Sequence, residues 1–212
     1  YVGGWRLPFY VTGGLSLALW VPLWLWLPSG QRRLGQRIDL FNRFKVIGRQ
    51  SASWYVLIAN ATQAAALVGL MTYFAAYMIE SYGWDEAKTA PGLALLGVGA
   101  VIGSFAGGVI TSRAHSLEWL AVISLAGGVV TGLLFSLDVS AWIVIAVALI
   151  ASALVSVSMP VMVTLMMHLA GQSRGTANGM FAASNQAGGF VGASAGGLML
   201  SQGGYPAVGL LY

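Results

Sequence analysis

Long apolar stretches separated by short polar ones dominate the sequence. Six of them reach the roughly 20 residues that a helix needs to cross the hydrocarbon core of a bilayer. Strands of transmembrane barrels are about 10 residues long and alternate in polarity, which these stretches do not. The pattern therefore predicts an all-α, polytopic membrane protein. The apolar runs cover residues 5–28, 54–79, 91–110, 117–137, 141–169 and 176–200, and a seventh begins at Tyr205.

Composition and charge agree with a chain that lies in lipid. Only 8% of the residues are charged, against about a quarter in soluble domains. The net charge of +4 indicates topology rather than a nucleic-acid partner, because six of the ten basic residues lie in the loop 29–53. If that loop is cytoplasmic, Arg113 and Arg174 are also inside and only Arg6 and Lys88 are outside, as the positive-inside rule predicts. The six loop residues are Arg32, Arg33, Arg37, Arg43, Lys45 and Arg49.

The second part of this loop mixes apolar and basic residues. Leu40, Phe41, Phe44, Val46 and Ile47 are interspersed with Arg43, Lys45 and Arg49. Such a segment forms either a short amphipathic helix on the inner leaflet or a linker that only solvates its charges. Both interpretations remain open at this point.

The two ends of the chain suggest a repeat. Gly3, Gly4 and Trp5 open the first run, and Gly203, Gly204 and Tyr205 open the last one six spans later. Parallel six-helix repeats place such segments at the same face with the same direction. The chain starts at Tyr1 rather than Met and ends eight residues into an apolar run, so we expect it to be cut at both ends.

Three segments carry a family resemblance. The segments 4–9, 174–179 and 184–189, together with the basic loop, resemble the major facilitator superfamily, especially its exporters of drugs and metabolites. The resemblance implies the sixth helix of the family at 1–28, the central cytoplasmic linker at 29–53, and the C-terminal half at 54–212, with five complete spans and a truncated sixth. A missing N-terminal half of the same chain is the implied partner, without which this part would not transport.

The resemblance also points to a cytoplasmic loop motif that contains Gly108, Arg113 and Arg174. Segment 108–113 looks like the second copy of the glycine, acidic and basic loop motif of the family. Ser112 stands where the first copy usually has Asp. A gating ion pair is therefore not expected there.

Small residues recur at helical spacing in several runs, and the sixth run has the richest cluster. In lipid, small residues let helix backbones approach each other closely. The cluster predicts either static packing or a smooth surface for sliding, and the resemblance places it at the interface between the two halves. The glycines assigned to interhalf packing or gating are Gly188, Gly189, Gly192, Gly196 and Gly197.

Polar side chains within three apolar runs form the candidate substrate cavity. A polar group in lipid costs free energy unless it faces a neighbouring helix or water. The alternative is that the same groups only form hydrogen bonds between helices, and a hydroxyl can also bond its own helix. Pro160 removes a donor for the Ser156 carbonyl and favours a kink. The cavity candidates are Thr62, Gln63 and Tyr73 in the second run, Ser152 and Ser156 in the fifth, and Asn185 in the sixth.

The absent residue types restrict the function. No Asp, Glu, Lys or Arg lies at the middle of a run, and the chain has no cysteine and two histidines. An enzyme, a metal site and a bound cofactor are therefore not expected. We expect a secondary transporter of small organic solutes in the plasma membrane, specifically a bacterial inner membrane. The resemblance implies a proton-coupled efflux permease, whose titrating carboxylate would then lie in the missing N-terminal half. An uptake symporter, a facilitator and a ligand-sensing membrane protein remain alternatives, whereas Arg113, His115 and Glu118 offer only a weak basis for an enzyme acting on lipids.

Overall fold

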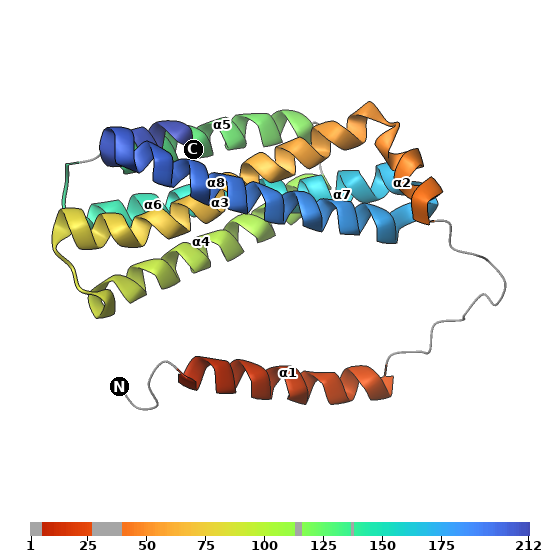
Figure 1. Cartoon of the computed structure of the whole chain (residues 1–212), viewed down its shortest axis with the longest axis horizontal. Helices are drawn as coiled ribbons and strands as arrows, with labels where there is room; N and C mark the ends of the chain where they lie inside the picture. Colours follow the sequence, from red (N-terminus) through yellow and green to blue (C-terminus); the bar gives the residue numbers. More distant parts are fainter. Residues whose placement is uncertain (1–5, 27–39, 113–115, 137) are drawn as a thin grey trace. The chain divides into compact units, whose positions relative to one another are not determined.

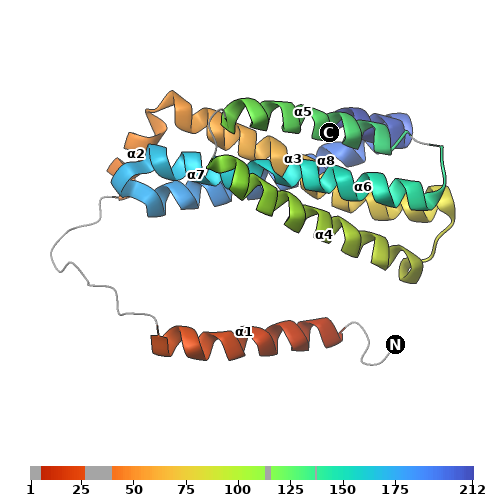
Figure 2. The same cartoon turned by 180° about the vertical axis from the view of Figure 1, so that it is seen from behind.

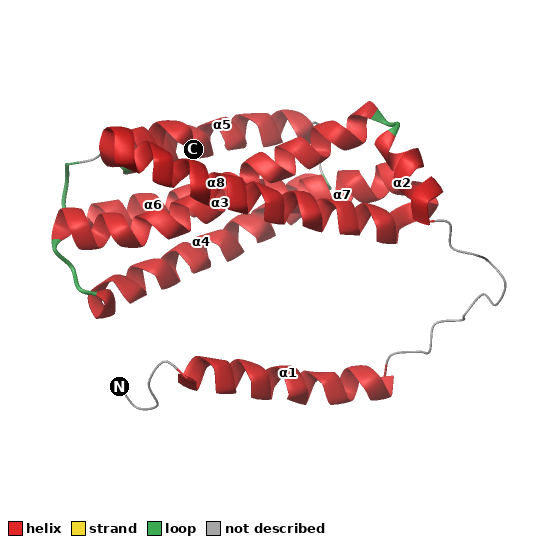
Figure 3. Ribbon diagram, viewed as in Figure 1, coloured by secondary structure: helices red, strands yellow, loops and turns green. Residues whose placement is uncertain are grey.

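The computed structural model describes residues 6–26, 40–112, 116–136 and 138–212. Every regular element among these residues is a helix, and five of their segments are long and apolar enough to cross a membrane. Figure 3 shows the same all-helical content. The chain divides into two units, residues 1–38 and 39–212. The prediction of an all-α, polytopic helical bundle is confirmed.

The first unit contains one described helix, α1 (Leu7–Trp26). Its described side chains are exposed except for the half-buried Pro22, and the rings of Trp20 and Trp24 stack with their centroids 6.1 Å apart. Pro22 lies inside the helix. The apolar surface agrees with a helix surrounded by lipid.

The second unit is a bundle of helices whose long axes run in similar directions (Figures 1 and 2). The predicted runs from the second onward reappear in its helices: the fifth is divided between two of them, the last helix joins the sixth and seventh, and one short helix lies within the predicted loop. The helices are α2 (Leu40–Gly48), α3 (Ser51–Tyr82), α4 (Glu86–Thr111), α5 (Ser116–Leu134), α6 (Ala141–Ser156), α7 (Ser158–Ala170) and α8 (Arg174–Leu211), with a 3₁₀ turn, η2 (Gly171–Ser173), before α8.

The turns between helices follow from local chemistry. At the end of α3, Gly83 has a φ of +63°, and the amide of Trp84 donates to the Met78 carbonyl at 3.3 Å, which closes the helix end. Asp85 then caps α4 by accepting a 2.7 Å hydrogen bond from the Lys88 amide. Helix α8 is interrupted at Gly204, whose backbone is not helical. The last segment, 205–211, therefore runs in a new direction.

The short helix α2 decides between the two interpretations of the basic loop, an amphipathic helix or a solvated linker. Ile47 is 1% exposed and packs with residues of α3, α7 and α8, whereas Val46 beside it is 57% exposed. The Trp54 indole N–H also donates to the Gly48 carbonyl at 2.9 Å. The segment is thus an amphipathic helix docked on one end of the bundle; its predicted contact with the inner leaflet stays a prediction.

Glycines join the helices in two close seams. Along α4, a Cβ at Gly99, Gly103 or Gly107 would overlap the backbone of α6 or the α6–α7 junction. Along α8, Gly188 and Gly192 meet the α3 backbone at Ala61 and Ala65 in the same way. These contacts need a residue without a side chain, as small-residue packing in lipid predicts.

Two apolar cores lie at opposite ends of the bundle. One is built around Phe74, Met78, Leu96 and Phe135, and the other around Ile47, Leu57, Met166 and Phe181. Most of the polar side chains predicted to form a cavity lie at sequence positions between these two cores. The middle of the bundle is therefore where the candidate site is found.

Candidate functional site at the break between two helices

The candidate site is centred on the junction of α6 and α7. The helix is interrupted at Val157, so that α6 ends at Ser156 and α7 begins at Ser158. Pro160 has no N–H to donate to the Ser156 carbonyl, which is the physical reason for the break. The backbone at Val157 keeps helical angles (φ −56°, ψ −35°), so the predicted kink stays a prediction. We call residues 155–160 the α6–α7 break.

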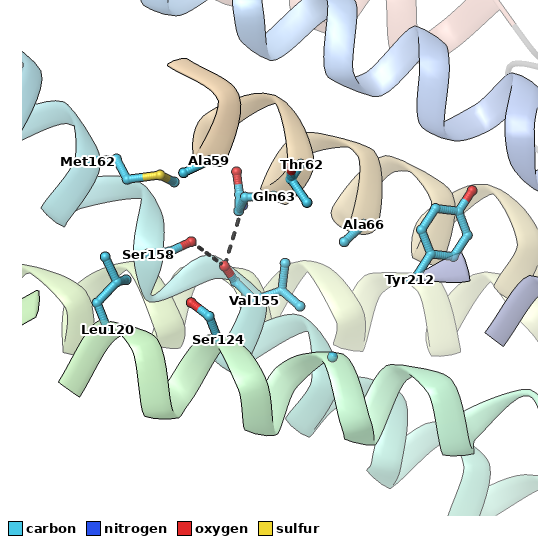
Figure 4. Close-up of a pocket in the computed structure, with 11 residues that line it drawn as sticks. Ala59, Thr62, Gln63, Ala66, Leu120, Ser124, Val155, Ser158, Met162 and Tyr212 are labelled. Carbon is cyan, nitrogen blue, oxygen red and sulfur yellow. Dashed lines mark hydrogen bonds between the residues drawn. The ribbon is translucent and has the colours of Figure 1, made fainter. Parts of the chain in front are cut away.

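Polar groups gather on one side of the α6–α7 break. The Ser158 hydroxyl donates to the Val155 carbonyl at 2.9 Å, and the Gln63 side-chain amide approaches the same oxygen at 3.5 Å (Figure 4). The other end of the Gln63 side chain, Oε1, is buried and accepts no hydrogen bond from the described part of the chain. A buried amide oxygen without a donor is costly, so the position is suited to a ligand, a water or another helix that supplies one.

A first cavity, of about 310 Å³, opens on this side between α3, α5 and the α6–α7 break. We call it the α3–α5 cavity. Figure 4 shows Thr62 and Gln63 of α3 facing Leu120 and Ser124 of α5 across it. Segment 205–211 packs against α5, where the Gly209 carbonyl lies next to Gly132, and Tyr212 closes one end of the cavity. The lining residues are Ala59, Thr62, Gln63, Ala66, Leu120, Ser124, Gly128, Val155, Ser158, Met162 and Tyr212.

A second cavity, of about 410 Å³, opens between α3, α4 and the α6–α7 break. We call it the α4–α7 cavity. Ser156 lines it and is 3% exposed, and its hydroxyl has no hydrogen-bond partner within the described residues. At its mouth the side chain of Phe105 is 76% exposed and that of Met159 is 41% exposed. The lining residues are Leu67, Ala100, Val101, Ser104, Phe105, Ser156 and Met159.

Both cavities are lined by uncharged side chains in the described part of the chain. Among the described residues that line them there is no Asp, Glu, Lys, Arg or His. Their polar groups are amide and hydroxyl, with thioether and aromatic surface beside them. Within the described ranges, no three His, Asp or Glu side chains come together in a group that could hold a metal ion.

The structure separates the six predicted cavity residues. Thr62 and Gln63 line the α3–α5 cavity, and Ser156 lines the α4–α7 cavity. Tyr73 is buried, donates to the Ala193 carbonyl and stacks with Tyr212, so it joins helices. Ser152 is fully buried and donates to the Leu149 carbonyl of its own helix. The prediction that all six serve one solute site stays a prediction.

Asn185, the sixth of these residues, belongs to a polar cluster that the sequence pattern did not predict. Its side-chain amide lies 3.5 Å from Oδ1 of Asn60, which is fully buried. Asn60 in turn donates to the Phe181 carbonyl at 2.9 Å and to the Ser184 hydroxyl at 2.7 Å. The sequence contains a signal for this cluster, because Asn60 is an amide inside an apolar run and such a group needs a partner on another helix.

The glycines assigned to interhalf packing or gating contact helices of their own unit. Gly188 and Gly192 contact α3 of the same unit, Gly189 faces Val68, and Gly196 and Gly197 lie beside Tyr73. Close packing is thus formed within this unit, and a role between halves stays a prediction. Of the loop motif, Gly108 lies inside α4 and Arg174 begins α8, whereas Arg113 lies outside the described residues.

Comparison with known families gives the class of protein. The sequence model described as Major Facilitator Superfamily matches residues 1–193. The chain belongs to the major facilitator superfamily. Its members are secondary transporters that bind small solutes in the bilayer, which assigns this multi-pass protein to transport rather than to an enzyme family. The corresponding comparisons with curated proteins and with solved structures found no significant match.

Proposed function

We propose that this superfamily member exports small, neutral or amphiphilic organic solutes by alternating access, and that the α6–α7 break supplies polar contacts to the solute. Two observations define the solute class. The cavities beside the break present amide and hydroxyl groups on an otherwise apolar wall, and no charged side chain lines them in the described part. Recognition of a strongly anionic solute normally uses Arg or Lys.

The observation that carries the proposal is the environment of Ser156. Its hydroxyl is buried without a partner in the described part of the chain, and the proline four residues later removes the donor for its carbonyl. Interrupted helices expose such groups to substrates near the middle of the membrane in other transporter folds. A hydroxyl or amine of a solute in the α4–α7 cavity would satisfy them.

Export is the direction we propose, on the basis of the resemblance of segments 174–179 and 184–189 to exporters. Neither cavity has an acidic lining residue in the described ranges. A proton-coupled cycle would therefore need a carboxylate that lies outside these two cavities. Uptake and facilitated diffusion are distinguished from export by solute flux in proteoliposomes with imposed proton gradients of both signs. A ligand-sensing protein would bind solute and show no flux.

The test of the site uses hydroxyl deletion in the intact transporter. Ser156→Ala removes the unpartnered hydroxyl, and loss of one neutral hydrogen bond predicts a rise of about 2- to 10-fold in KM. Thr131→Val is the matched control, because Thr131 is fully buried, bonds the Gly127 carbonyl of its own helix and lines neither cavity. Equal KM values for Ser156→Ala and the parent, across neutral, cationic and anionic solutes, would contradict the assignment.

A second variant distinguishes the two cavities. Gln63→Leu replaces the amide by a branched apolar group and so removes both the buried amide oxygen and the N–H that approaches the Val155 carbonyl. If the α3–α5 cavity also holds solute, the KM for transport by this variant rises, while the midpoint of its unfolding transition changes little. If the cavity is instead filled by a packed helix, Gln63→Leu changes stability and leaves KM at the parent value, and the solute site is restricted to the α4–α7 cavity.

A further inference from the structure

A third cavity, of about 420 Å³, lies where α7 ends and α8 begins. We call it the α7–α8 cavity. The chain reverses there at Gly171, whose φ of +52° is in the left-handed region. It is separate from the two central cavities, with which it shares no lining residue. Its lining residues are Val163, Thr164, Met167, His168, Gly171 and Arg174.

The α7–α8 cavity offers hydrogen-bond donors and positive charge without a counter-charge. Arg174 and His168 are both exposed, and no carboxylate is among the described residues that line the cavity. Arg174 forms no ion pair within the part of the chain that the structure describes. It is also the first residue of α8, and a cation at the amino end of a helix opposes the helix dipole.

The surroundings strengthen the field at this end. Ser173, at the N-cap position, makes no side-chain hydrogen bond to the first turn of α8. The basic helix α2, which carries exposed Lys45, packs against α8. By the positive-inside rule this end faces the cytoplasm, at the depth of the lipid headgroups.

We propose that the α7–α8 cavity binds a phosphate group, held by the Arg174 guanidinium, by His168 and by the amino end of α8. A guanidinium can bind two phosphate oxygens at once, and the amino end of a helix favours an anion. One phosphate would therefore offset the unfavourable position of Arg174 at the amino end of α8. The phosphate can belong to an anionic phospholipid of the inner leaflet or to a soluble phosphate compound. This binding goes beyond solute transport and requires neither central cavity.

The test compares side-chain variants of the intact transporter in two arms. In the first, the protein is placed in nanodiscs of phosphatidylcholine with increasing phosphatidylglycerol, and bound lipid is counted by native mass spectrometry. In the second, the protein in detergent is titrated with inorganic phosphate and its unfolding temperature is followed. The variants are Arg174→Gln and His168→Gln, with Arg49→Gln as the matched control because Arg49 is an exposed basic residue of the α2–α3 turn outside the cavity.

The expected result is a loss of phosphate or anionic-lipid binding only in variants of residues that line the α7–α8 cavity. Removal of one basic contact weakens binding of an anionic headgroup about fivefold, so Arg174→Gln reduces phosphatidylglycerol binding by this factor and Arg49→Gln does not. The same selectivity in the inorganic-phosphate arm alone identifies a soluble phosphate compound as the ligand. Unchanged binding in Arg174→Gln in both arms, or an equal loss in Arg49→Gln, would overturn the proposal.

Discussion

The contact between α8 and α3 provides the sharpest test of how the bundle is held together. A Cβ at Gly192 would lie 2.5 Å from the Ala65 Cα, 2.6 Å from its carbonyl oxygen and 2.7 Å from its Cβ. All three are rigid atoms that no rotamer change can move. Gly192→Ala therefore forces the two helices apart by roughly 0.9 Å before ordinary contact is restored.

The cost follows from the loss of packing along the seam. Overpacking of a close contact costs about 1–3 kcal/mol, and replacing Gly by Ala within a helix returns up to about 1 kcal/mol. Gly179→Ala is the matched control, because it lies in the same helix with nothing within 4 Å of a new Cβ. The helix-propensity gain is common to both variants, so their difference in free energy of unfolding should be about 1–3 kcal/mol.

The assay is reversible unfolding of the purified transporter in mixed micelles, or steric trapping in bicelles, for the parent and both variants. Gly192→Ala is expected to be the least stable and Gly179→Ala to equal or exceed the parent. Gly192→Ser should resemble Gly192→Ala, because any Cβ creates the same overlap. If Gly192→Ala and Gly179→Ala have the same free energy of unfolding, α3 and α8 do not pack as closely as the structure has them.

Three further predictions concern other parts of the bundle. Asn60→Ala should lower the free energy of unfolding by about 1–3 kcal/mol, because it leaves partners on α8 unpaired. Thr62→Ala should change it by less than about 0.5 kcal/mol, because the Thr62 hydroxyl is exposed and bonds its own helix. Urea or SDS titrations measure both values. The chain contains no cysteine, so maleimide labelling can check the docking of α2: Val46→Cys should react rapidly and Ile47→Cys slowly, and equal rates would contradict the docking. Pro160→Ala should restore a backbone hydrogen bond to the helix break and slow solute flux without lowering the unfolding temperature, which parallel flux and melting measurements would show.

Much of the fold could be predicted because the bilayer imposes it. A run of about 20 apolar residues must form a helix to satisfy its backbone groups in lipid. The apolar runs of the sequence reappear as helices, except that the fifth is divided into α6 and α7 and the last two are joined in α8. Pro160 made the helix break predictable for the same local reason. The α2 helix could not be decided in advance, because its stability depends on Ile47 finding a pocket among residues of α3, α7 and α8.

The site was less predictable, because side-chain partners depend on which helices are neighbours. The sequence pattern grouped Gln63 with Tyr73 in one candidate cavity, but α3 packs against α4, α6, α7 and α8. A helix with neighbours on several sides has several buried faces. Gln63 therefore lines a cavity and Tyr73 bonds α8. Asn60, which was not among the cavity candidates, bonds three residues of α8.

The arrangement of seams and cavities explains how one bundle combines rigidity with a polar interior. Apolar side chains gain little by leaving lipid for a protein core, so the two end cores alone cannot hold the helices together. The glycine seams do so through close backbone contact, α8 on α3 and α4 on α6, and they place no bulky side chain at the contacts. The break between α6 and α7 adjoins both seams, because Gly107 meets the Val157 carbonyl and Gln63 of α3 approaches the Val155 carbonyl. Its unsatisfied groups are thus fixed in position by rigid neighbours, which is the arrangement required for hydrogen bonds from a passing solute to be selective.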